Sequence, residues 1–147
     1  MSRSIDVHDY LGIQQLVATY VWALDTADLA TLSTLFTEDA IMRDTSGREY
    51  KGKPAILAYF SELTQSPRFR GRQHHIDHPL FERTEEGYVC RSYWTVTKWD
   101  SAAGTKLIEV AGHSRDVYVR RGDRWVFQER LLYYWTSADC PWAGSAG

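Results

Sequence analysis

Asp25 is the residue in this sequence whose surroundings most clearly point to chemistry. Asp25 shares one helical face with Val17 and Val21, because positions i, i+4 and i+8 lie on the same side of a helix. A carboxylate therefore ends an apolar stripe, and a buried carboxylate needs a partner. The alternative is that the helix has already ended and that Asp25 is a solvated turn or cap residue.

The segment RQHHIDHPLF offers three histidines as possible partners, and one arrangement pairs Asp25 with His74. If Asp25 accepts a hydrogen bond from one ring nitrogen of His74, the carboxylate fixes the tautomer and raises the basicity of the other nitrogen. That nitrogen can then remove a proton without any nucleophile. The ordinary alternative is a strand histidine that its neighbours satisfy.

The same segment argues against a metal site. On a strand that rises ~3.3 Å per residue, His74 and His78 stand roughly 13 Å apart, which is too far to ligate one ion. His75 and Asp77 are closer to each other on the opposite face, but no third ligand is evident. We therefore expect no metal and no metal-ligand residues.

Further candidates lie in the last strand and in the predicted pocket. Arg130, in WVFQERLLYYW, could face inward and stabilise developing negative charge on a substrate or leaving group. The alternative for Arg130 is an ion pair with Glu129 or Asp116. Tyr20 and Trp94 could line the pocket, although aromatic residues at such spacing are more often core.

Several sequence motifs of cofactor-dependent and covalent catalysis are missing. The chain has no glycine-rich phosphate loop, no GxSxG elbow and no metalloprotease helix motif. We expect no cofactor, and the chemistry must come from acid, base and electrostatic groups.

The first half of the chain reads as helices. Apolar spacing predicts an amphipathic helix over 9–24, Asp28 can cap a short second helix that ends near Phe36, and Pro54 begins a third helix. A short strand is expected at 40–42. These helices must be the elements that carry Asp25 and cover the pocket.

The second half reads as four strands, at 73–83, 88–99, 105–120 and 125–136. The turn signals EEG, SAAG and RGD make consecutive strands antiparallel, and strands of this length must twist and curl. Helices followed by a meander predict an α+β fold, with about three helices packed on a strongly curved, mainly antiparallel sheet that encloses an apolar pocket.

Alternation predicts which side chains face that pocket. One face should carry His74, Ile76, His78, Trp94, Val96, Val110, Gly112, Ser114, Val126, Gln128 and Arg130. The substrate contacts expected from this set and from the first helix are Tyr20, His78, Trp94, Val96, Val110 and Gly112. On the outer face, we expect Trp99, Tyr118 and Trp135 to be exposed and to pack against another copy in a homodimer or homotrimer.

Composition limits the class of protein. The 147 residues suit a single domain over 1–147, with an ordered core at about 5–137 and a tail at 138–147, and 44% of them are hydrophobic. A net charge of −2 disfavours nucleic-acid binding. The chain has no apolar run of the ~18 residues that a membrane span needs, its N-terminus lacks an apolar leader, and Cys90 and Cys140 are isolated. A cytoplasmic protein is expected.

Four segments together resemble the SnoaL-like cyclases and dehydratases of the nuclear transport factor 2-like superfamily: IQQLVATYVWALDTADLATLSTLFTEDAIM, YKGKPAILAYF, HHIDHPLF and VYVRRGDRWVFQERLLYYW. The resemblance implies a cone-shaped barrel of helices wrapped on a curved sheet. Members with lyase activity, such as scytalone dehydratase, bile acid dehydratase and hexachlorocyclohexane dehydrochlorinase, use an Asp at the end of the first long helix with a sheet His.

Asp25 and His74 occupy positions that match this pair. Arg130 follows Trp125 by five residues, as a site arginine does in the dehydrochlorinase, and Tyr20 resembles a site tyrosine of the bile acid enzyme. The chain departs from the pattern at His78, where many relatives have Asn, and the doubled His74 and His75 leave two possible registers.

The resemblance favours a cofactor-independent lyase, a dehydratase in particular, acting on a hydrophobic cyclic or aromatic small molecule. An isomerase or a polyketide cyclase would use the same Asp–His pair. A non-catalytic small-ligand-binding module and the small β subunit of a ring-hydroxylating dioxygenase, which needs a large α partner, remain alternatives.

Overall fold

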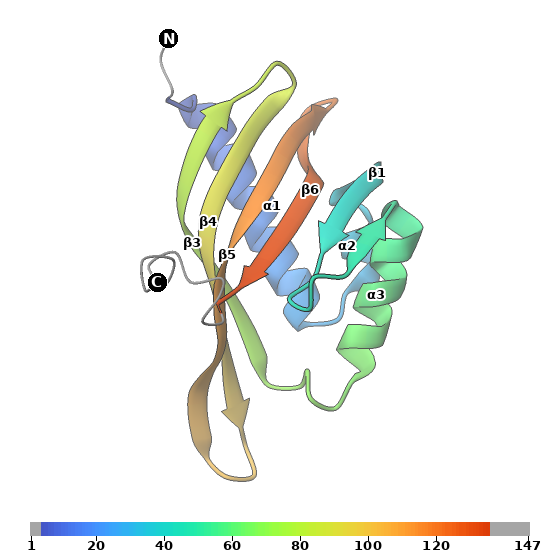
Figure 1. Cartoon of the computed structure of the whole chain (residues 1–147), viewed down its shortest axis with the longest axis vertical. Helices are drawn as coiled ribbons and strands as arrows, with labels where there is room; N and C mark the ends of the chain where they lie inside the picture. Colours follow the sequence, from blue (N-terminus) through green and yellow to red (C-terminus); the bar gives the residue numbers. More distant parts are fainter. Residues whose placement is uncertain (1–3, 136–147) are drawn as a thin grey trace, which may run out of the picture.

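The computed structural model of the chain describes residues 4–135, which form helices packed on one six-stranded sheet (Figure 1). The elements in chain order are α1 (Val7–Asp25), α2 (Leu29–Ser33), β1 (Phe36–Arg43), β2 (Glu49–Lys51), α3 (Lys53–Gln65), β3 (Arg72–Arg83), β4 (Gly87–Asp100), β5 (Thr105–Arg121) and β6 (Arg124–Tyr134). The predicted C-terminal tail and Cys140 lie outside the described residues.

The helix α1 confirms the predicted amphipathic helix and extends it to Asp25. Asp6 caps its start by accepting the backbone N–H of His8 at 2.8 Å. One side of α1 is buried, at Ile13, Leu16, Val17, Tyr20, Ala23 and Leu24. Asp25 is therefore the last helical residue, and the alternative that the helix ends before it is wrong.

The helix α2 is shorter than predicted. Asp28 caps it as expected, accepting the backbone N–H of Thr31 at 3.0 Å, but the helix ends at Ser33 rather than near Phe36. Phe36 instead begins β1, because its backbone and its ring join the sheet and the core opposite Phe127. The strand expected at 40–42 thus starts four residues earlier.

The sheet has the strand order β2-β1-β6-β5-β4-β3. Strands β3 to β6 form the predicted antiparallel meander, whereas β1 pairs with β6 in parallel and carries the short, unpredicted β2 at the edge. In Figure 1, α1 runs across the concave face and α3 lies beside β1 and β2. The fold is α+β as predicted, with a curved sheet that stays open instead of closing into a barrel.

A bulge in β3 removes His78 from the predicted inner face. The pairing of β3 with β4 shifts between Asp77 and Leu80, and His78 adopts a φ of 53°, in the left-handed region. Its ring packs against Tyr93, 5.8 Å between centroids, and hydrogen-bonds Asp77. Since Asp77 pairs with Tyr93 on the outer side of the sheet, the placement of His78 beside His74 was wrong.

A second bulge ends the predicted alternation in β6. Val117 pairs with Glu129 and Tyr118 with Phe127, so Gln128 is the extra residue between them. Phe127 and Arg130 therefore face the helices together, and Val126, paired with Val119, lies on the other side of the sheet. The inward placement predicted for Val126 and Gln128 was wrong for this reason.

An aromatic cluster between the helices and the sheet forms the centre of the core. Tyr20 contacts the rings of Phe36, Phe60 and Phe127 at 5.3–6.2 Å between centroids. Each such buried ring contributes about 1.5–3 kcal/mol from the hydrophobic effect. Tyr118 is only 1% exposed and belongs to this core, because its position in β5 has the same parity as that of Gly112; its predicted exposure was wrong.

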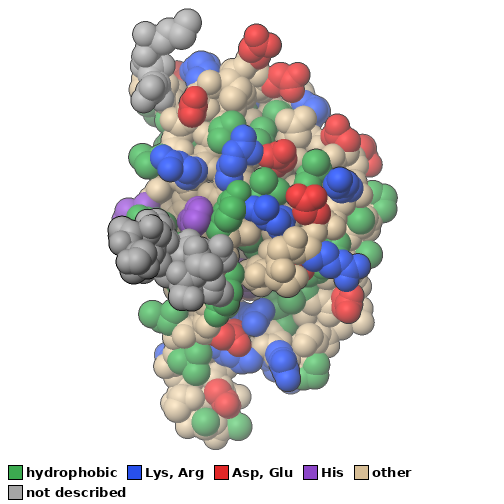
Figure 2. All heavy atoms as spheres, viewed as in Figure 1, with side chains coloured by type: hydrophobic (Ala, Val, Ile, Leu, Met, Phe, Trp, Pro, Cys, Tyr) green, Lys and Arg blue, Asp and Glu red, His purple; other side chains and the backbone are tan. Residues whose placement is uncertain are grey.

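The outer surface mixes charge signs. In the view of Figure 2, acidic and basic side chains alternate across the face over β1, β5 and β6 without a large basic patch. Trp99 is exposed as predicted, with 55% of its surface accessible, and Trp135 is partly buried.

No helix within residues 4–135 is long and apolar enough to cross a membrane.

Candidate functional site

Asp25 and His74 form a two-point contact where the C-terminal end of α1 meets the start of β3. The Asp25 carboxylate accepts the backbone N–H of His74 at 3.0 Å through Oδ2. Its other oxygen, Oδ1, lies 2.5 Å from Nδ1 of the His74 ring. With both oxygens engaged by one residue, the carboxylate orients the imidazole and selects the tautomer that carries its proton on Nδ1.

The second ring nitrogen of His74, Nε2, has no hydrogen bond to any residue within 4–135. The side chains of His74 and Asp25 are 18% and 17% exposed, so the pair is sheltered but reachable. Phe69, in the turn before β3, stacks on the His74 ring at 5.9 Å between centroids. A carboxylate-oriented imidazole with one free nitrogen in a partly apolar setting is the arrangement expected of a general base.

The register between the two neighbouring histidines is now defined. His75 points to the opposite side of β3, where its Nε2 lies 3.1 Å from Oγ1 of Thr97. His74 pairs with Val96 and faces the helices. The structure therefore brings Asp25 to His74 and leaves His75 on the outer face.

Trp94 and Val96 form a buried apolar wall beside His74, as their predicted inward positions require. The indole N–H of Trp94 donates to the backbone carbonyl of His113 at 2.8 Å, so the ring presents only carbon to the interior. A Cβ at Gly112 would lie 2.5 Å from Cζ2 of Trp94, which shows that the ring rests directly on this glycine. Val110 pairs with Val96 in the same row.

Arg130 is buried in an ion pair and does not offer a free cation. Its Nη1 donates to both carboxylate oxygens of Asp116, at 2.9 and 3.0 Å, and the guanidinium lies 4.8 Å from the centroid of the Tyr20 ring. The residue is 3% exposed, and its Nε has no partner among the described residues. Of the two alternatives for Arg130, the ion pair with Asp116 is the one observed.

Asp116 anchors a buried polar cluster below the wall. Ser114 donates to its Oδ2 at 2.8 Å, and Ser92 lies 3.2 Å from Ser114. Burial raises the pKa of Asp116 despite the opposing effect of Arg130, and Asp116 raises the pKa of Arg130 although burial lowers it. The guanidinium of Arg130 stays charged because of its high intrinsic basicity.

The inward positions of Ser92 and Asp116 were missed in the sequence, although a signal for them exists. Ser92 precedes Trp94 by two residues in β4, and Asp116 follows Ser114 by two in β5, so simple alternation would have added both to the inner face. Phe69 lies in a turn, and no periodic pattern could have placed its ring on His74.

Tyr20 lies in the aromatic core beneath Arg130 and is 2% exposed. Burial raises the pKa of its hydroxyl. His78, by contrast, lies on the outer side of the sheet, and its side chain is 76% exposed. Tyr20 is buried in the core and His78 lies on the outer side of the sheet, so neither offers an accessible side chain beside His74.

A small cavity of about 10 Å³ lies between α1 and the sheet, lined by residues that include Val17, Ile76 and Ser92. Such a volume holds about one water molecule. A ring-sized substrate could occupy this part of the interior only if side chains of α1 or β4 moved.

Within residues 4–135, no three His, Cys, Asp or Glu side chains cluster so that they could hold a metal ion. The Asp25 carboxylate and the His74 imidazole are in direct contact, and together such groups can transfer protons.

Helices packed on the concave side of an open, curved, six-stranded sheet define an α+β protein with a cystatin-like fold. The chain belongs to the SnoaL-like domain family, which matches residues 6–131. No curated protein sequence matches the chain.

Solved structures with the same fold include three that cover most of this chain. Aln2 from a Streptomyces species is 24% identical over 88% of this chain and 93% of its own, with a TM-score of 0.80. A protein of unknown function from Nostoc punctiforme, with a cystatin-like fold, is 19% identical (91% and 96%, TM-score 0.78). A protein provisionally named as a scytalone dehydratase, from Novosphingobium aromaticivorans, is 20% identical (88% and 86%, TM-score 0.76). At these identities the likeness supports the fold alone.

Proposed function

We propose that the protein is a cofactor-independent lyase, a dehydratase in particular, that acts on a hydrophobic cyclic or aromatic small molecule. The observation that carries this proposal is the double contact of Asp25 with His74, which leaves Nε2 of His74 without a partner among the described residues. The apolar wall of Trp94 and Val96 suits a substrate of this kind.

In the proposed reaction, Nε2 of His74 removes a proton from a carbon next to an electron-withdrawing group. Asp25 holds the ring in place and stabilises the imidazolium that forms. The electron pair of the broken C–H bond forms the new double bond, and the hydroxyl group leaves with the proton that His74 returns. The products are the alkene and water, so the enzyme is restored without a cofactor.

Arg130 was expected to stabilise the developing charge. Because its guanidinium is held by Asp116 and covered by Tyr20, we assign it instead to holding Asp116 and the aromatic core in place. An isomerase or a cyclase would share the first proton abstraction, and only the substrate separates these reactions from dehydration. A small-ligand-binding module without catalysis is the alternative from a second class, because the same fold can serve binding alone.

The test is a screen of hydroxylated cyclic compounds for loss of water, with wild type, Asp25→Asn, His74→Ala and the matched control His75→Ala. We expect the first two variants to lose about 10²- to 10⁴-fold in kcat/KM and the control to keep its activity, since His75 faces away. Turnover that survives both Asp25→Asn and His74→Ala would refute the mechanism. Saturable binding without turnover in any variant would assign the protein to the binding class.

We also propose that the outer face of the sheet packs against another copy in a homodimer or homotrimer. Large apolar side chains are exposed there and on the β4–β5 hairpin: Tyr93 (49%), Trp99 (55%), Leu107 (49%) and Ile108 (71%). Light scattering on the purified chain should give a multiple of the 17.0 kDa mass, and Ile108→Lys should shift it toward the monomer. A monomer at all concentrations would contradict this proposal.

A further inference from the structure

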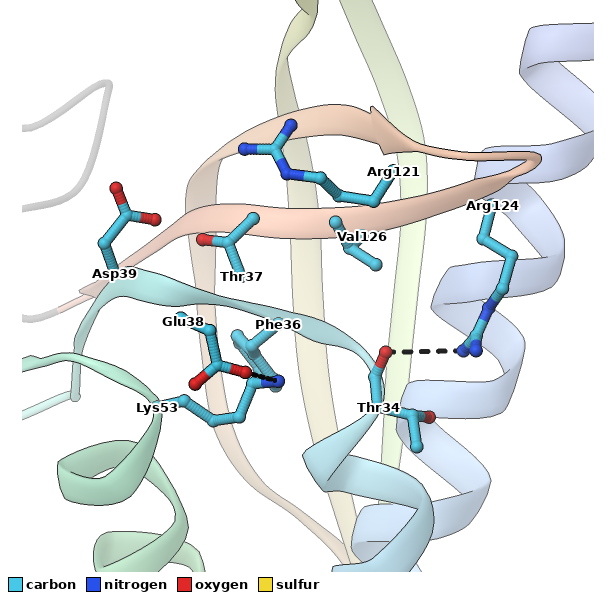
Figure 3. Close-up of a pocket in the computed structure, with 9 residues that line it drawn as sticks. All are labelled: Thr34, Phe36, Thr37, Glu38, Asp39, Lys53, Arg121, Arg124 and Val126. Atoms are coloured by element: carbon cyan, nitrogen blue, oxygen red, sulfur yellow. Dashed lines mark hydrogen bonds and ion pairs between the residues drawn. The ribbon is translucent and has the colours of Figure 1, made fainter.

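A second cavity lies apart from the Asp25–His74 pair, between β1 and the turn that joins β5 to β6 (Figure 3). Its volume is about 360 Å³, which is within the range of small-molecule sites. Charged side chains on its wall include Asp39, Arg121 and Arg124, and neither Asp25 nor His74 takes part in it.

An irregular pairing of β1 opens this cavity. Phe36 pairs with Phe127 and Ile41 with Glu129, so the stretch of β1 between them has more residues than the facing stretch of β6. The extra residues bow β1 away from its neighbour. In Figure 3, Thr37 on β1 and Val126 on β6 lie beside each other on the wall of this cavity, below the guanidinium of Arg121.

Thr37 is the buried polar residue of this wall. It is 6% exposed, and its Oγ1 is shielded from solvent without a hydrogen bond to any residue within 4–135. A buried hydroxyl that makes no hydrogen bond costs stability, and such groups are rare in folded proteins. A valine has nearly the same shape and would avoid that cost. The presence of a hydroxyl at this position therefore points to a hydrogen-bond partner that is not one of the described residues.

The two arginines that line this cavity with Thr37, Arg121 and Arg124, have hydrogen-bond donors that the described residues do not occupy. Arg121 donates from Nη1 to the carbonyl of Arg120 at 3.0 Å, and Arg124 donates from Nη2 to the carbonyl of Thr34 at 3.3 Å. No other hydrogen bond or ion pair joins either guanidinium to the described residues. Each of these arginines therefore keeps further N–H donors for a ligand.

The acidic groups of the wall differ from each other. Glu38 is neutralised by Lys53 at 2.7 Å, whereas Asp39 makes no hydrogen bond or ion pair with a described residue. Figure 3 shows Asp39 on the same side of the cavity as the guanidinium of Arg121. Two available cations and one available anion thus line the same cavity.

We infer that this cavity binds a small molecule that carries an oxyanion together with an ammonium group. The oxyanion lies against Arg121 and the hydroxyl of Thr37, and the ammonium group lies against Asp39. The charge pattern of the wall matches such a ligand, because charge-assisted hydrogen bonds then satisfy both ends and Thr37 gains its missing partner. This inference concerns a site separate from the proposed catalytic pair and does not depend on it.

The test is a titration of the isotope-labelled chain, followed by amide chemical shifts, with 2-aminoethylphosphonate and with methylphosphonate at equal ionic strength. We expect saturable shifts at Thr37, Asp39 and Arg121, with at least tenfold tighter binding of the aminated compound. Arg121→Gln should weaken binding of both compounds at least tenfold. Asp39→Asn should abolish the preference for the aminated one.

The variants separate a ligand site from a structural feature. Thr37→Val should weaken binding at least threefold while leaving the Tm of the free protein unchanged or higher, and Arg70→Gln, an exposed arginine outside the cavity, should bind as wild type does. Absence of saturable shifts in wild type, equal binding in Arg121→Gln, or a lower Tm in Thr37→Val without ligand would each overturn the inference.

Discussion

The Arg130 guanidinium and the Asp116 carboxylate form a buried ion pair, with one nitrogen of the arginine shared between both oxygens at 2.9 and 3.0 Å. Removing one partner leaves an uncompensated charge in the interior. We predict that Asp116→Asn lowers the free energy of unfolding by about 3–5 kcal/mol, measured by urea denaturation. The double variant Asp116→Asn/Arg130→Met should be more stable than the single one. Additive losses in the double variant would contradict the pairing.

The Nδ1 tautomer of His74 can be observed directly. The 2.5 Å contact with Asp25 predicts a protonated Nδ1 and an unprotonated Nε2 in the neutral ring, which nitrogen chemical shifts distinguish. In Asp25→Asn, the fraction of this tautomer should fall, because the amide is a weaker acceptor than the carboxylate. The His75 signals serve as the internal control. An unchanged tautomer ratio at His74 would show that Asp25 does not orient the ring.

Gly112 should be intolerant of any side chain. A methyl group there meets both the Trp94 ring, at 2.5 Å from Cζ2, and the carbonyl of Tyr133. We predict that Gly112→Ala costs about 1–3 kcal/mol by overpacking and changes the near-ultraviolet circular dichroism of the tryptophans. Trp94→Leu in the Gly112→Ala background should recover part of this loss. If Gly112→Ala unfolds like wild type, the ring does not rest on this position in solution.

The hydrogen bonds to Asp44 predict that part of the free energy of unfolding depends on pH. Burial alone would raise the pKa of Asp44, but hydrogen bonds from Ser46, Tyr50 and the backbone N–H of Arg48 outweigh it and lower the pKa. A lowered folded-state pKa gives stability that is complete above the unfolded value of about 3.9 and is lost as the pH falls through the folded value.

The corresponding variant is Asp44→Asn, which should lower the free energy of unfolding by about 1–3 kcal/mol at pH 7 and by less at pH 3. Urea denaturation at the two pH values measures the difference. Asp123→Asn, at an exposed turn residue without a hydrogen bond to the described residues, is the control and should have little effect at either pH. A deficit in Asp44→Asn that is the same at both pH values would refute the linkage.

Much of the inner face could be predicted from the sequence, because regular strands alternate with period two. His74, Trp94, Val96, Val110 and Gly112 all face inward as that period requires. The prediction failed at His78, Val126 and Gln128, where the bulges in β3 and β6 each insert a residue, since a shift of one position exchanges the two faces. A single chain carries no strong local signal for such an insertion.

The partners of charged groups were harder to predict. Asp25 and His74 were paired on the basis of a family resemblance, and the contact of Asp25 with the backbone N–H of His74 could not have been foreseen from either residue. For Arg130, the sequence left two possible ion-pair partners, Glu129 and Asp116. Asp116 is the partner because the register of β5 and β6 places it directly opposite Arg130, where both side chains are buried. Long-range pairing, as between β1 and β6, leaves no trace in local periodicity.

The parallel contact of β1 with β6 has a consequence for how the chain is made. Phe36 in β1 meets Phe127 in β6, far along the chain, so the aromatic core cannot close until β6 has left the ribosome. Contacts between residues that are far apart in the sequence slow folding. The apolar face of α1 therefore stays exposed to solvent while the rest of the chain is synthesised. We expect the nascent chain to need protection from aggregation during that interval, until β6 emerges.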